Sequence, residues 1–287
     1  MQWQQFDWLI EAALREDGAR RDVTTDALVS ADLRCKARML AKGHGVICGL
    51  PLAARVCEVL DKELKLEPAC EDGSPIEKGT EVARIAGPAA GLLKVERTLL
   101  NFVQRLSGIA TLTRRFCDAV DGTGAEVFDT RKTTPGWRAL EKYAVRCGGG
   151  RNHRMGLSDQ VLIKDNHLAL WLAQPGGDIA GAVSAARKAA GADMVVEVEV
   201  ERLDDLEEAL DAGADVVLLD NMTPEQVRTA AAVVRRKFPR GQRPLLEASG
   251  SINLENIRAY AEAGADRISV GALTHSAPAL DVSLQME

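Results

Sequence analysis

The chain has 287 residues, of which 46% are hydrophobic and 27% charged, and its formal net charge is -6. This composition is that of a folded protein with a substantial core, and the length allows one large barrel or two domains. The acidic balance and an aromatic content of only 4% argue against nucleic acid as a partner, and no apolar run approaches the roughly 18 residues of a membrane span.

The cysteines and the amino terminus indicate in which cellular compartment the protein is found. The six cysteines form no CxxC pair and show no cysteine and histidine spacing typical of zinc. The stretch up to Asp17 holds four acidic residues where a signal peptide would need a basic start and an apolar centre. We therefore expect a cytoplasmic protein whose thiols are reduced and mostly buried.

Residues 1–108 are predicted to form an α+β sandwich domain of antiparallel strands and helices. Apolar residues from Phe6 to Leu14 follow helical spacing, and Pro51 suits the first turn of a helix that continues to about Leu60. The segment RRDVTTDALVS, residues 20–30, is expected to be an irregular loop. The strands are expected at 64–67, at 81–85, and as a turn-linked pair within 35–49.

Helical periodicity returns after Gly91. Apolar residues between Leu92 and Leu106 predict a long buried helix. The pair Ser107-Gly108 is expected to break it, and a second helix should then run to about Val120.

A βα repeat follows. The tetrapeptide AGAD occurs at 190–193, 212–215 and 263–266. Each copy follows a helical segment and precedes an apolar run, the pattern of a helix that ends at glycine before a buried parallel strand. Similar apolar runs lie at 127–130, 161–164 and 244–250. We predict an α/β fold class, an open TIM-like βα barrel over 109–275, with the segment 276–287 joined to the N-terminal domain.

Polar residues stand where the predicted barrel strands end. They are Arg131, Lys132, Lys164, Glu199, Asp220, Glu247, Ser249, Gly250 and Gly271. Ligands of parallel α/β sheets bind at the carboxyl ends of the strands, so these residues are expected to share one site. Glu197, Glu199 and Glu201 alternate along one strand. We expect Glu199 to face the site, and the alternative is that this set faces helices or solvent.

The residues from Asp129 to His167 differ in charge from the rest of the chain. They include eight lysines and arginines and four acidic residues, a net charge of +4 (8 minus 4) in a protein of net charge -6. A cationic island in an acidic protein suits a small polyanion, although a solvated basic face is the plainer reading. The glycine run 148–150 and a lysine that ends an apolar strand favour a site.

The residue types at these strand ends suggest a reaction class. Lysines and arginines bind carboxylates and phosphates, and glycine-rich turns after two late strands can bind a phosphate through backbone N–H groups. Glu199 and Asp220 suit the hydroxyls of a sugar or a magnesium ion. A phosphorylated sugar beside an anionic second substrate suggests ribosyl transfer, in which the protein positions reactants and stabilises separated charge.

Seven segments together resemble a known family. They are ERTLLNFVQRLSGIAT (96–111), DTRKTTPGWRALEKYAVRCGGGRNHRMGL (129–157), LIKDNH (162–167), VEVEV (196–200), LLDNM (218–222), EASGSI (247–252) and LTHSAPALD (273–281). They resemble nicotinate-nucleotide pyrophosphorylase (carboxylating), also called quinolinate phosphoribosyltransferase (decarboxylating). The resemblance implies that quinolinate and phosphoribosyl pyrophosphate are converted, with Mg²⁺, to nicotinate mononucleotide, pyrophosphate and CO₂ in NAD biosynthesis.

The resemblance also implies roles for individual residues. Those expected to line the quinolinate pocket are Arg131, His153, Arg154 and Lys164. Lys132 matches a residue that meets the pyrophosphate-bearing substrate, and Lys132, Lys164, Glu199 and Asp220 are the expected catalytic set. Glu199 and Asp220 are expected near the ribose and the Mg²⁺, largely through substrate and water. The phosphate loops are expected to contain Ser249, Gly250, Gly271 and His275.

The resemblance further implies a homodimer in which Arg97 enters the neighbouring subunit's site, and it leaves room for a higher oligomer. Ser251 and Ser158 depart from the family's usual residues, and neither change removes a charge from the pocket.

Three other readings are open. One is a paralogue on the same scaffold, related to molybdenum transport or specific for nicotinate, for which a mono-acid substrate would need fewer cations. A second is a Schiff-base aldolase that uses Lys164. The third is a phosphate sensor without turnover.

Overall fold

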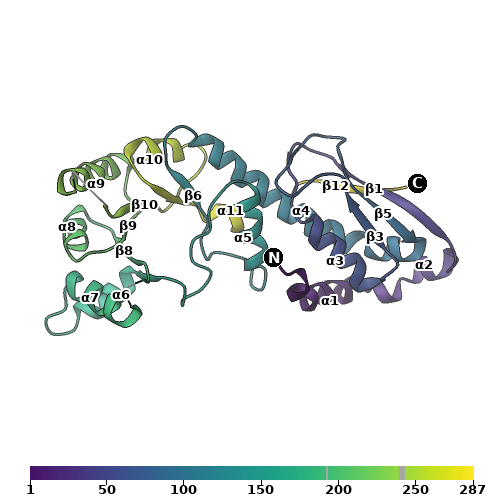
Figure 1. Ribbon diagram of the computed structural model, residues 1–287, viewed down its shortest axis with the longest axis horizontal. Helices are drawn as coiled ribbons and strands as arrows, with labels where there is room; N and C mark the ends of the chain where they lie inside the picture. Colours follow the sequence, from purple (N-terminus) through teal and green to yellow (C-terminus); the bar gives the residue numbers. More distant parts are fainter. Residues whose placement is uncertain (192, 239–242) are drawn as a thin grey trace. The chain divides into compact units, whose positions relative to one another are not determined.

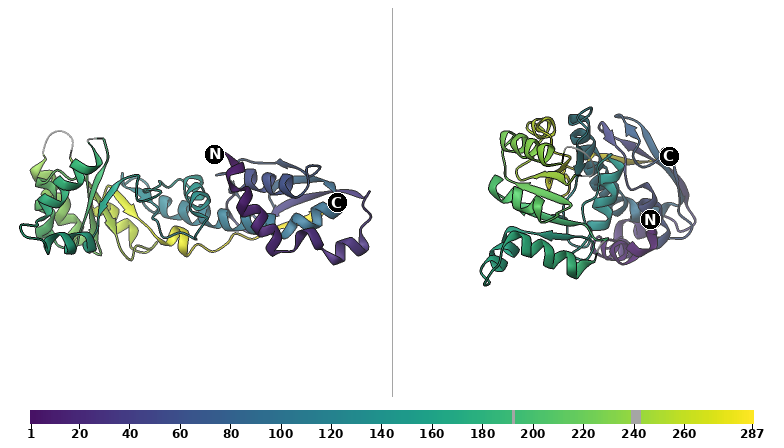
Figure 2. Two further views of the ribbon diagram at one scale, coloured as in Figure 1. Left: turned by 90° about the horizontal axis from the view of Figure 1, so that it is seen from below. Right: turned by 60° about the vertical axis from the view of Figure 1, so that its left-hand side comes forward.

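The computed structural model describes residues 1–191, 193–238 and 243–287, and these form two compact units. Unit 1 comprises Met1–Arg114, Thr134–Gly149 and Ser276–Glu287, and unit 2 comprises Arg115–Thr133 and Gly150–His275. Both chain termini lie in unit 1 (Figure 2). Compared with the expected limits 1–108, 109–275 and 276–287, the difference lies mainly in residues 134–149, which pack in unit 1.

Unit 1 contains an antiparallel sheet with the strand order β12-β1-β5-β3. Its strands are β1 (Arg34–Ala41), β3 (Lys65–Pro68), β5 (Glu81–Pro88) and β12 (Val282–Met286). The chain's last strand therefore pairs with the first long one, with Ala37 opposite Met286.

A second, two-stranded sheet pairs β2 (Gly45–Val46) with β4 (Pro75–Ile76). The two strands expected within 35–49, joined by a turn, are confirmed as β1 and β2, although these strands belong to different sheets. The Val46 N–H donates to the Thr111 hydroxyl at 2.9 Å, so a partner distant in sequence holds this segment away from β1.

Besides the long helix described below, the helices of unit 1 are η1 (Trp3–Phe6), α1 (Asp7–Glu16), η2 (Ala19–Arg21), α2 (Val23–Leu28), α3 (Leu50–Leu60) and α5 (Arg138–Cys147). The sequence did not predict α2. The expected loop at 20–30 is wrong, because Asp22 caps α2 by accepting the N–H groups of Thr24 and Thr25 at 3.1 Å each. Cys48 and Cys57 are buried and the other four cysteines are partly exposed, so the thiols are not mostly buried.

The helix α4 (Ala89–Ala119) runs unbroken for 31 residues, and the expected break at Ser107-Gly108 is wrong. The Ser107 hydroxyl accepts the N–H of Cys48 at 2.9 Å and donates to its carbonyl at 3.1 Å. A side chain at Gly108 would collide with the backbone of Pro278. These small residues allow close packing and do not end the helix.

Residues 134–149 pack in unit 1 through aromatic and ionic contacts. Trp137 stacks on Phe102 of α4 with ring centroids 4.9 Å apart. The buried carboxylate of Glu141 lies 3.0 Å from the Arg105 guanidinium. Because α5 ends at Cys147, this packing places the start of the glycine run in unit 1.

Unit 2 is a six-stranded parallel sheet with the order β6-β11-β10-β9-β8-β7. The strands are β6 (Glu126–Phe128), β7 (Val161–Ile163), β8 (Val196–Val200), β9 (Val216–Asp220), β10 (Leu245–Ser249) and β11 (Arg267–Ser269). The helices are α6 (Asp165–Leu172), α7 (Ile179–Ala190), α8 (Leu203–Asp211), α9 (Pro224–Lys237), α10 (Ile257–Ala263) and α11 (Ala272–His275). Figure 1 shows α8, α9 and α10 along one side of the curved sheet. The predicted fold class, an open α/β barrel beside an antiparallel α+β domain, is confirmed.

The aspartates of the AGAD repeat tie neighbouring strands together. Asp215 accepts the N–H of Val196 at 2.7 Å, and Asp266 accepts the N–H of Leu246 at 2.8 Å. Each aspartate thus joins the start of its own strand to the start of the adjacent one. The copy at 190–193 includes Ala192, which lies outside the described residues. None of the helices in the described ranges has both the length and the apolar character that crossing a membrane requires.

Candidate active site

A cavity of about 540 Å³ opens at the carboxyl ends of the unit 2 strands. Ten of the residues that the sequence placed at this site line it: Arg131, Lys132, His153, Arg154, Lys164, Glu199, Asp220, Glu247, Ser249 and Gly250. They come from five different strand ends or the loops that follow, and from the segment before β7 that holds His153 and Arg154, so the convergence depends on the parallel sheet.

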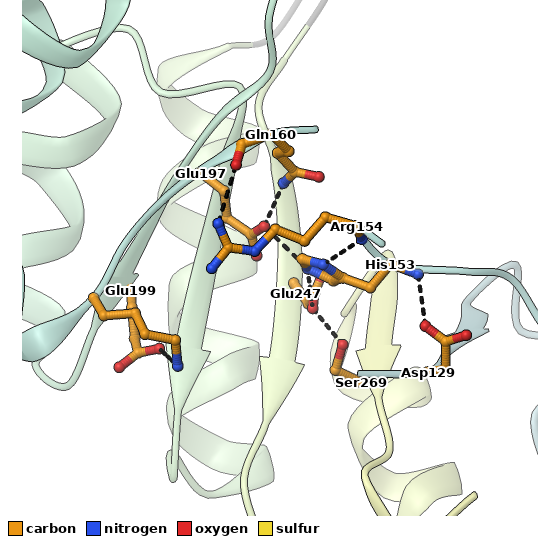
Figure 3. Close-up of polar contacts among 9 residues, drawn as sticks. Asp129, His153, Arg154, Gln160, Glu197, Glu199, Glu247 and Ser269 are labelled. Atoms are coloured by element: carbon orange, nitrogen blue, oxygen red, sulfur yellow. Dashed lines mark hydrogen bonds and ion pairs between the residues drawn. The ribbon is translucent and has the colours of Figure 1, made fainter. Parts of the chain in front are cut away.

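The segment after the glycine run lies along β6. Arg151 forms a parallel bridge with Phe128. Asp129, which is fully buried, accepts the backbone N–H of His153 at 2.9 Å and the side-chain amide of Asn152 at 2.6 Å. This carboxylate fixes the backbone from which His153 and Arg154 enter the cavity (Figure 3).

Arg131 and Arg154 bring two positive charges to one side of the cavity. Arg154 is buried, and its guanidinium donates to the carbonyl of Gln160 at 3.1 Å. Burial and the nearby Arg131 lower the pKa of Arg154. The two guanidinium groups repel each other, and an anion placed between them would relieve that repulsion.

Lys164 and Glu199 line the same cavity. Lys164 follows β7 immediately before α6, and its Nζ lies 3.2 Å from Oε2 of Glu199. Its backbone N–H donates to Nδ1 of His167 at 2.9 Å, which holds the chain at the start of α6. Glu199 thus lines the cavity, as expected from the alternation along β8.

Asp220 ends β9 beside Glu199. Burial, followed by the charge of Glu199, raises the pKa of Asp220, whereas Lys164 lowers it. Two neighbouring carboxylates in a polar cavity supply the hard oxygen donors that magnesium prefers. Glu199 and Asp220 therefore fit the magnesium ion that was expected beside them from the sequence.

The turn after β10 has no room for a side chain at Gly250. Its φ is +99°, and an added Cβ would collide with the Asn221 side chain. Asn221, after β9, also has a positive φ of 53° and donates to the Asp220 carboxylate at 2.7 Å. The backbone of the turn at Gly250 therefore packs against the Asn221 side chain of the other turn at the rim of the cavity.

Gly271, Lys132 and His275 form a second close-packed turn. A Cβ at Gly271 would lie 3.1 Å from both Cδ of Lys132 and Nε2 of His275. The Thr274 hydroxyl donates to the Lys132 carbonyl at 2.7 Å. Gly271 and His275 are thus neighbours of the cavity residue Lys132, although they are outside the set that lines the cavity.

A buried cluster lies beneath His153, and the sequence did not predict it. Its members are Glu197, Glu247, Gln160 and Ser269 (Figure 3). The sequence signal that could have predicted this cluster is the presence of glutamates inside otherwise apolar strands. Glu197 could equally have faced solvent, and Glu247 was noted only as a strand end.

Arg97 is a further residue that was expected at the site. It is an exposed side chain of α4 in unit 1 and does not line the cavity.

Comparisons with known proteins match this chain along nearly its whole length. The family model described as "Quinolinate phosphoribosyl transferase, N-terminal domain" matches residues 22–107, and that described as "Quinolinate phosphoribosyl transferase, C-terminal domain" matches residues 109–285. A probable nicotinate-nucleotide pyrophosphorylase [carboxylating] of Bacillus subtilis is 41% identical over 282 residues, which cover 98% of this chain and 93% of the relative. The nicotinate-nucleotide pyrophosphorylase [carboxylating] of Mycobacterium leprae is 43% identical over 280 residues, covering 96% and 95%.

Solved structures agree. NadC from Streptococcus pyogenes superposes with a TM-score of 0.92 at 40% identity and covers 100% of this chain and 98% of its own. The nicotinate-nucleotide pyrophosphorylase from Francisella tularensis gives a TM-score of 0.91 at 38% identity, with the same coverage.

Proposed function

The chain belongs to the quinolinate phosphoribosyl transferase family, and from this premise we infer how its own residues perform the family's reaction. The enzyme transfers the phosphoribosyl group of phosphoribosyl pyrophosphate to quinolinate and releases CO₂, a step of NAD biosynthesis. The observation that carries the assignment to this cavity is that cations and carboxylates from five strand ends and from the segment before β7 share about 540 Å³.

We assign the cationic side of the cavity to quinolinate. Its two adjacent carboxylates need several positive groups, and Arg131, Arg154 and Lys164 all line the cavity. A guanidinium can bind a carboxylate through two parallel hydrogen bonds, which fixes the plane of the ring as well as its position. His153 lies beside these cations in the same cavity.

The acidic side of the cavity suits the sugar. The bond between the ribose carbon and pyrophosphate breaks as the ring nitrogen attacks, so positive charge develops on the ribose. Glu199 and Asp220 would stabilise this charge and accept hydrogen bonds from the ribose hydroxyls. Lys132 and the turns at Ser249–Gly250 and Gly271–His275 would bind the phosphates.

Mg²⁺ is the proposed cofactor, held by Glu199 and Asp220 largely through substrate and water. When bound, it would neutralise charge on the pyrophosphate group. The two carboxylates would then have the further task of keeping the ribose hydroxyls oriented while the bond breaks.

Loss of CO₂ follows from the chemistry of the ribosylated ring. Ribosylation makes the ring nitrogen positive, and that charge stabilises the carbanion left when the neighbouring carboxylate departs as CO₂. The protein's contribution is to hold the other carboxylate, so that the ring stays in place through both steps.

We also propose a homodimer to which Arg97, an exposed side chain of α4, contributes across the interface, with room for a higher oligomer. A cytoplasmic location is proposed because the six cysteines form no disulfide. The Schiff-base alternative is disfavoured by the ion pair of Lys164 with Glu199, because a Schiff-base nucleophile must be a neutral amine.

The test is incubation of the purified chain with quinolinate, phosphoribosyl pyrophosphate and Mg²⁺, with CO₂ and nucleotide measured together. We expect equal amounts of both products, and none when any one component is left out. Nicotinate in place of quinolinate is the control. Efficient nucleotide formation from nicotinate would contradict the assignment and would favour the paralogue with a mono-acid substrate.

A further inference from the structure

The buried cluster under the cavity centres on His153. Its Nε2 lies 3.1 Å from Oε2 of Glu197 and 3.5 Å from Oε1 of Glu247. Both carboxylates are fully buried, and the His153 side chain is only 7% exposed. Figure 3 shows the imidazole between the two glutamates on one side and the Arg154 backbone on the other.

The hydrogen bonds define the tautomer of His153. The backbone N–H of Arg154 donates to Nδ1 at 2.8 Å, so Nδ1 presents its lone pair. The imidazole is therefore neutral, with its hydrogen on Nε2 toward the glutamates. Neither ring nitrogen has an N–H group directed at the substrate.

The charge of the cluster then requires one more proton. Two ionised carboxylates in contact with a neutral imidazole would place two negative charges in a buried site, which is costly. Within the described residues, Oε1 of Glu197 and Oε2 of Glu247 are buried without a hydrogen-bond partner. Burial, followed by the charge of Glu197, raises the pKa of Glu247 to about 7, and the hydrogen bond from Ser269 and the charge of Arg267 oppose this rise.

A proton fits this geometry better than a metal ion does. Gln160 donates to Oε2 of Glu197 and Ser269 donates to Oε1 of Glu247, each at 2.5 Å. The oxygens closest to His153 therefore already accept hydrogen bonds. Metal ligands would have to direct those lone pairs at an ion about 2.0 to 2.2 Å away.

We propose that Glu247 holds one proton in the buried site that it forms with His153 and Glu197, and that this site thereby positions Arg154 for the dicarboxylate substrate. The proposal rests on the proposed function, because that function assigns Arg154 to quinolinate. Arg154 contacts the cluster through both its backbone and its guanidinium. Its backbone donates to His153, and its guanidinium donates to the carbonyl of Gln160, whose amide binds Glu197. His153, Glu197 and Glu247 are positioning residues in this scheme.

Several charged and titratable groups face the cluster. Arg154 and Asp129 contact His153 from its own segment and from the end of β6, and Arg267 acts on Glu247 from β11. When Glu247 loses its proton, a second negative charge appears beneath the cations that bind the substrate. We expect the affinity for quinolinate to fall at alkaline pH, with a smaller effect on kcat.

The experiment measures the KM for quinolinate from mildly acidic to alkaline pH in the full-length enzyme. In the unmodified protein, KM should rise by up to about tenfold for each pH unit above the pKa of Glu247, because only the protonated form is competent. Glu247→Gln should remove this rise, since an amide stays neutral at every pH. Glu255→Gln, which removes an exposed carboxylate of the same unit, is the matched control and should keep the wild-type profile.

Two measurements do not depend on turnover. Nitrogen NMR of the histidines should show His153 with an unprotonated Nδ1, and infrared spectra should show a carboxylic acid band that disappears as the pH rises. An alkaline rise in KM that persists in Glu247→Gln would overturn the proposal, as would an imidazolium at His153. A stoichiometric metal ion that is lost in both Glu197→Gln and Glu247→Gln would also overturn it. Absence of turnover in the unmodified protein would instead refute the proposed function, and the spectra would still decide this point.

Discussion

Lys164 and Glu199 face each other at the ends of neighbouring strands, with Nζ 3.2 Å from Oε2. The lysine side chain is 45% exposed and the glutamate 8%. The ammonium group therefore reaches the cavity and can contact a substrate carboxylate, while the buried glutamate stays in place. This pair joins the cationic side of the cavity to its acidic side.

Replacing Lys164 with alanine should abolish measurable turnover without unfolding the chain. The loss removes a charge that acts on the reacting substrate, so kcat/KM should fall at least about 100-fold. A partly exposed pair contributes only about 1 kcal/mol to the free energy of unfolding. CO₂ release measures the loss of turnover, and thermal unfolding measures whether the fold is kept. Arg131→Ala should behave in the same way. Lys188→Ala, an exposed lysine of α7, is the control. Wild-type CO₂ release in either cavity variant would contradict the proposed pocket.

Gly250→Ala should weaken binding of phosphoribosyl pyrophosphate. The residue needs a φ of +99°, and its Cβ would collide with Asn221. Gly213→Ala is the matched control, because its φ is +80° and no atom lies within 4 Å of the added Cβ. Both variants should lose about 1 kcal/mol of stability from backbone strain. Only Gly250→Ala should raise the Kd measured by calorimetry, and equal Kd values in the two variants would argue against a phosphate loop here.

Binding of the magnesium complex of phosphoribosyl pyrophosphate should weaken at acidic pH. Burial and Glu199 raise the pKa of Asp220, so this carboxylate takes up a proton at a higher pH than an exposed aspartate does. Protonation removes a charge that the complex requires. Calorimetry over a pH series should show this loss, and Asp220→Asn should bind weakly at every pH. An Asp220→Asn protein with the wild-type acidic limb would rule out Asp220 as its source.

The free energy of unfolding should fall as the pH rises from about 4.5 to about 7, in part because of Glu247. Its pKa is raised from 4.5 to about 7 in the folded protein, so the folded state binds more protons in that interval. The contribution is fully present below 4.5 and is lost as the pH rises through the folded-state pKa, by an amount on the order of 3 kcal/mol. Urea titrations of the wild type and of Glu247→Gln should diverge across this window. Parallel curves would show that Glu247 does not carry the proton.

Mixing two inactive variants tests the shared site. Arg97→Ala and Lys164→Ala proteins should each lack activity, and heterodimers formed after subunit exchange should regain part of it. The reason is that one of the two sites would then contain both wild-type side chains. No recovery, despite exchange demonstrated by mass spectrometry, would argue against donation of Arg97 across an interface.

Much of the site followed from the sequence, because several of its residues stand at the ends of apolar runs. Parallel strands bring their carboxyl ends to one edge, so the positions of Arg131, Lys164 and Asp220 in the chain implied a common cavity. The α2 helix was missed because Asp22 acts through a capping hydrogen bond rather than through periodicity.

Tertiary structure decided the features that depend on partners distant in the chain. Ser107-Gly108 has the composition of a helix break, yet contacts with Cys48 and Pro278 keep α4 continuous. Glu197, His153 and Glu247 lie on separate segments, and nothing local to any of them predicts that they meet. The sequence alone determined the succession of strands along the chain and the residue types at their ends, because periodicity and turn chemistry act over a few residues. Which buried charges share a proton depends on distances across the sheet, and only the folded chain determines those distances.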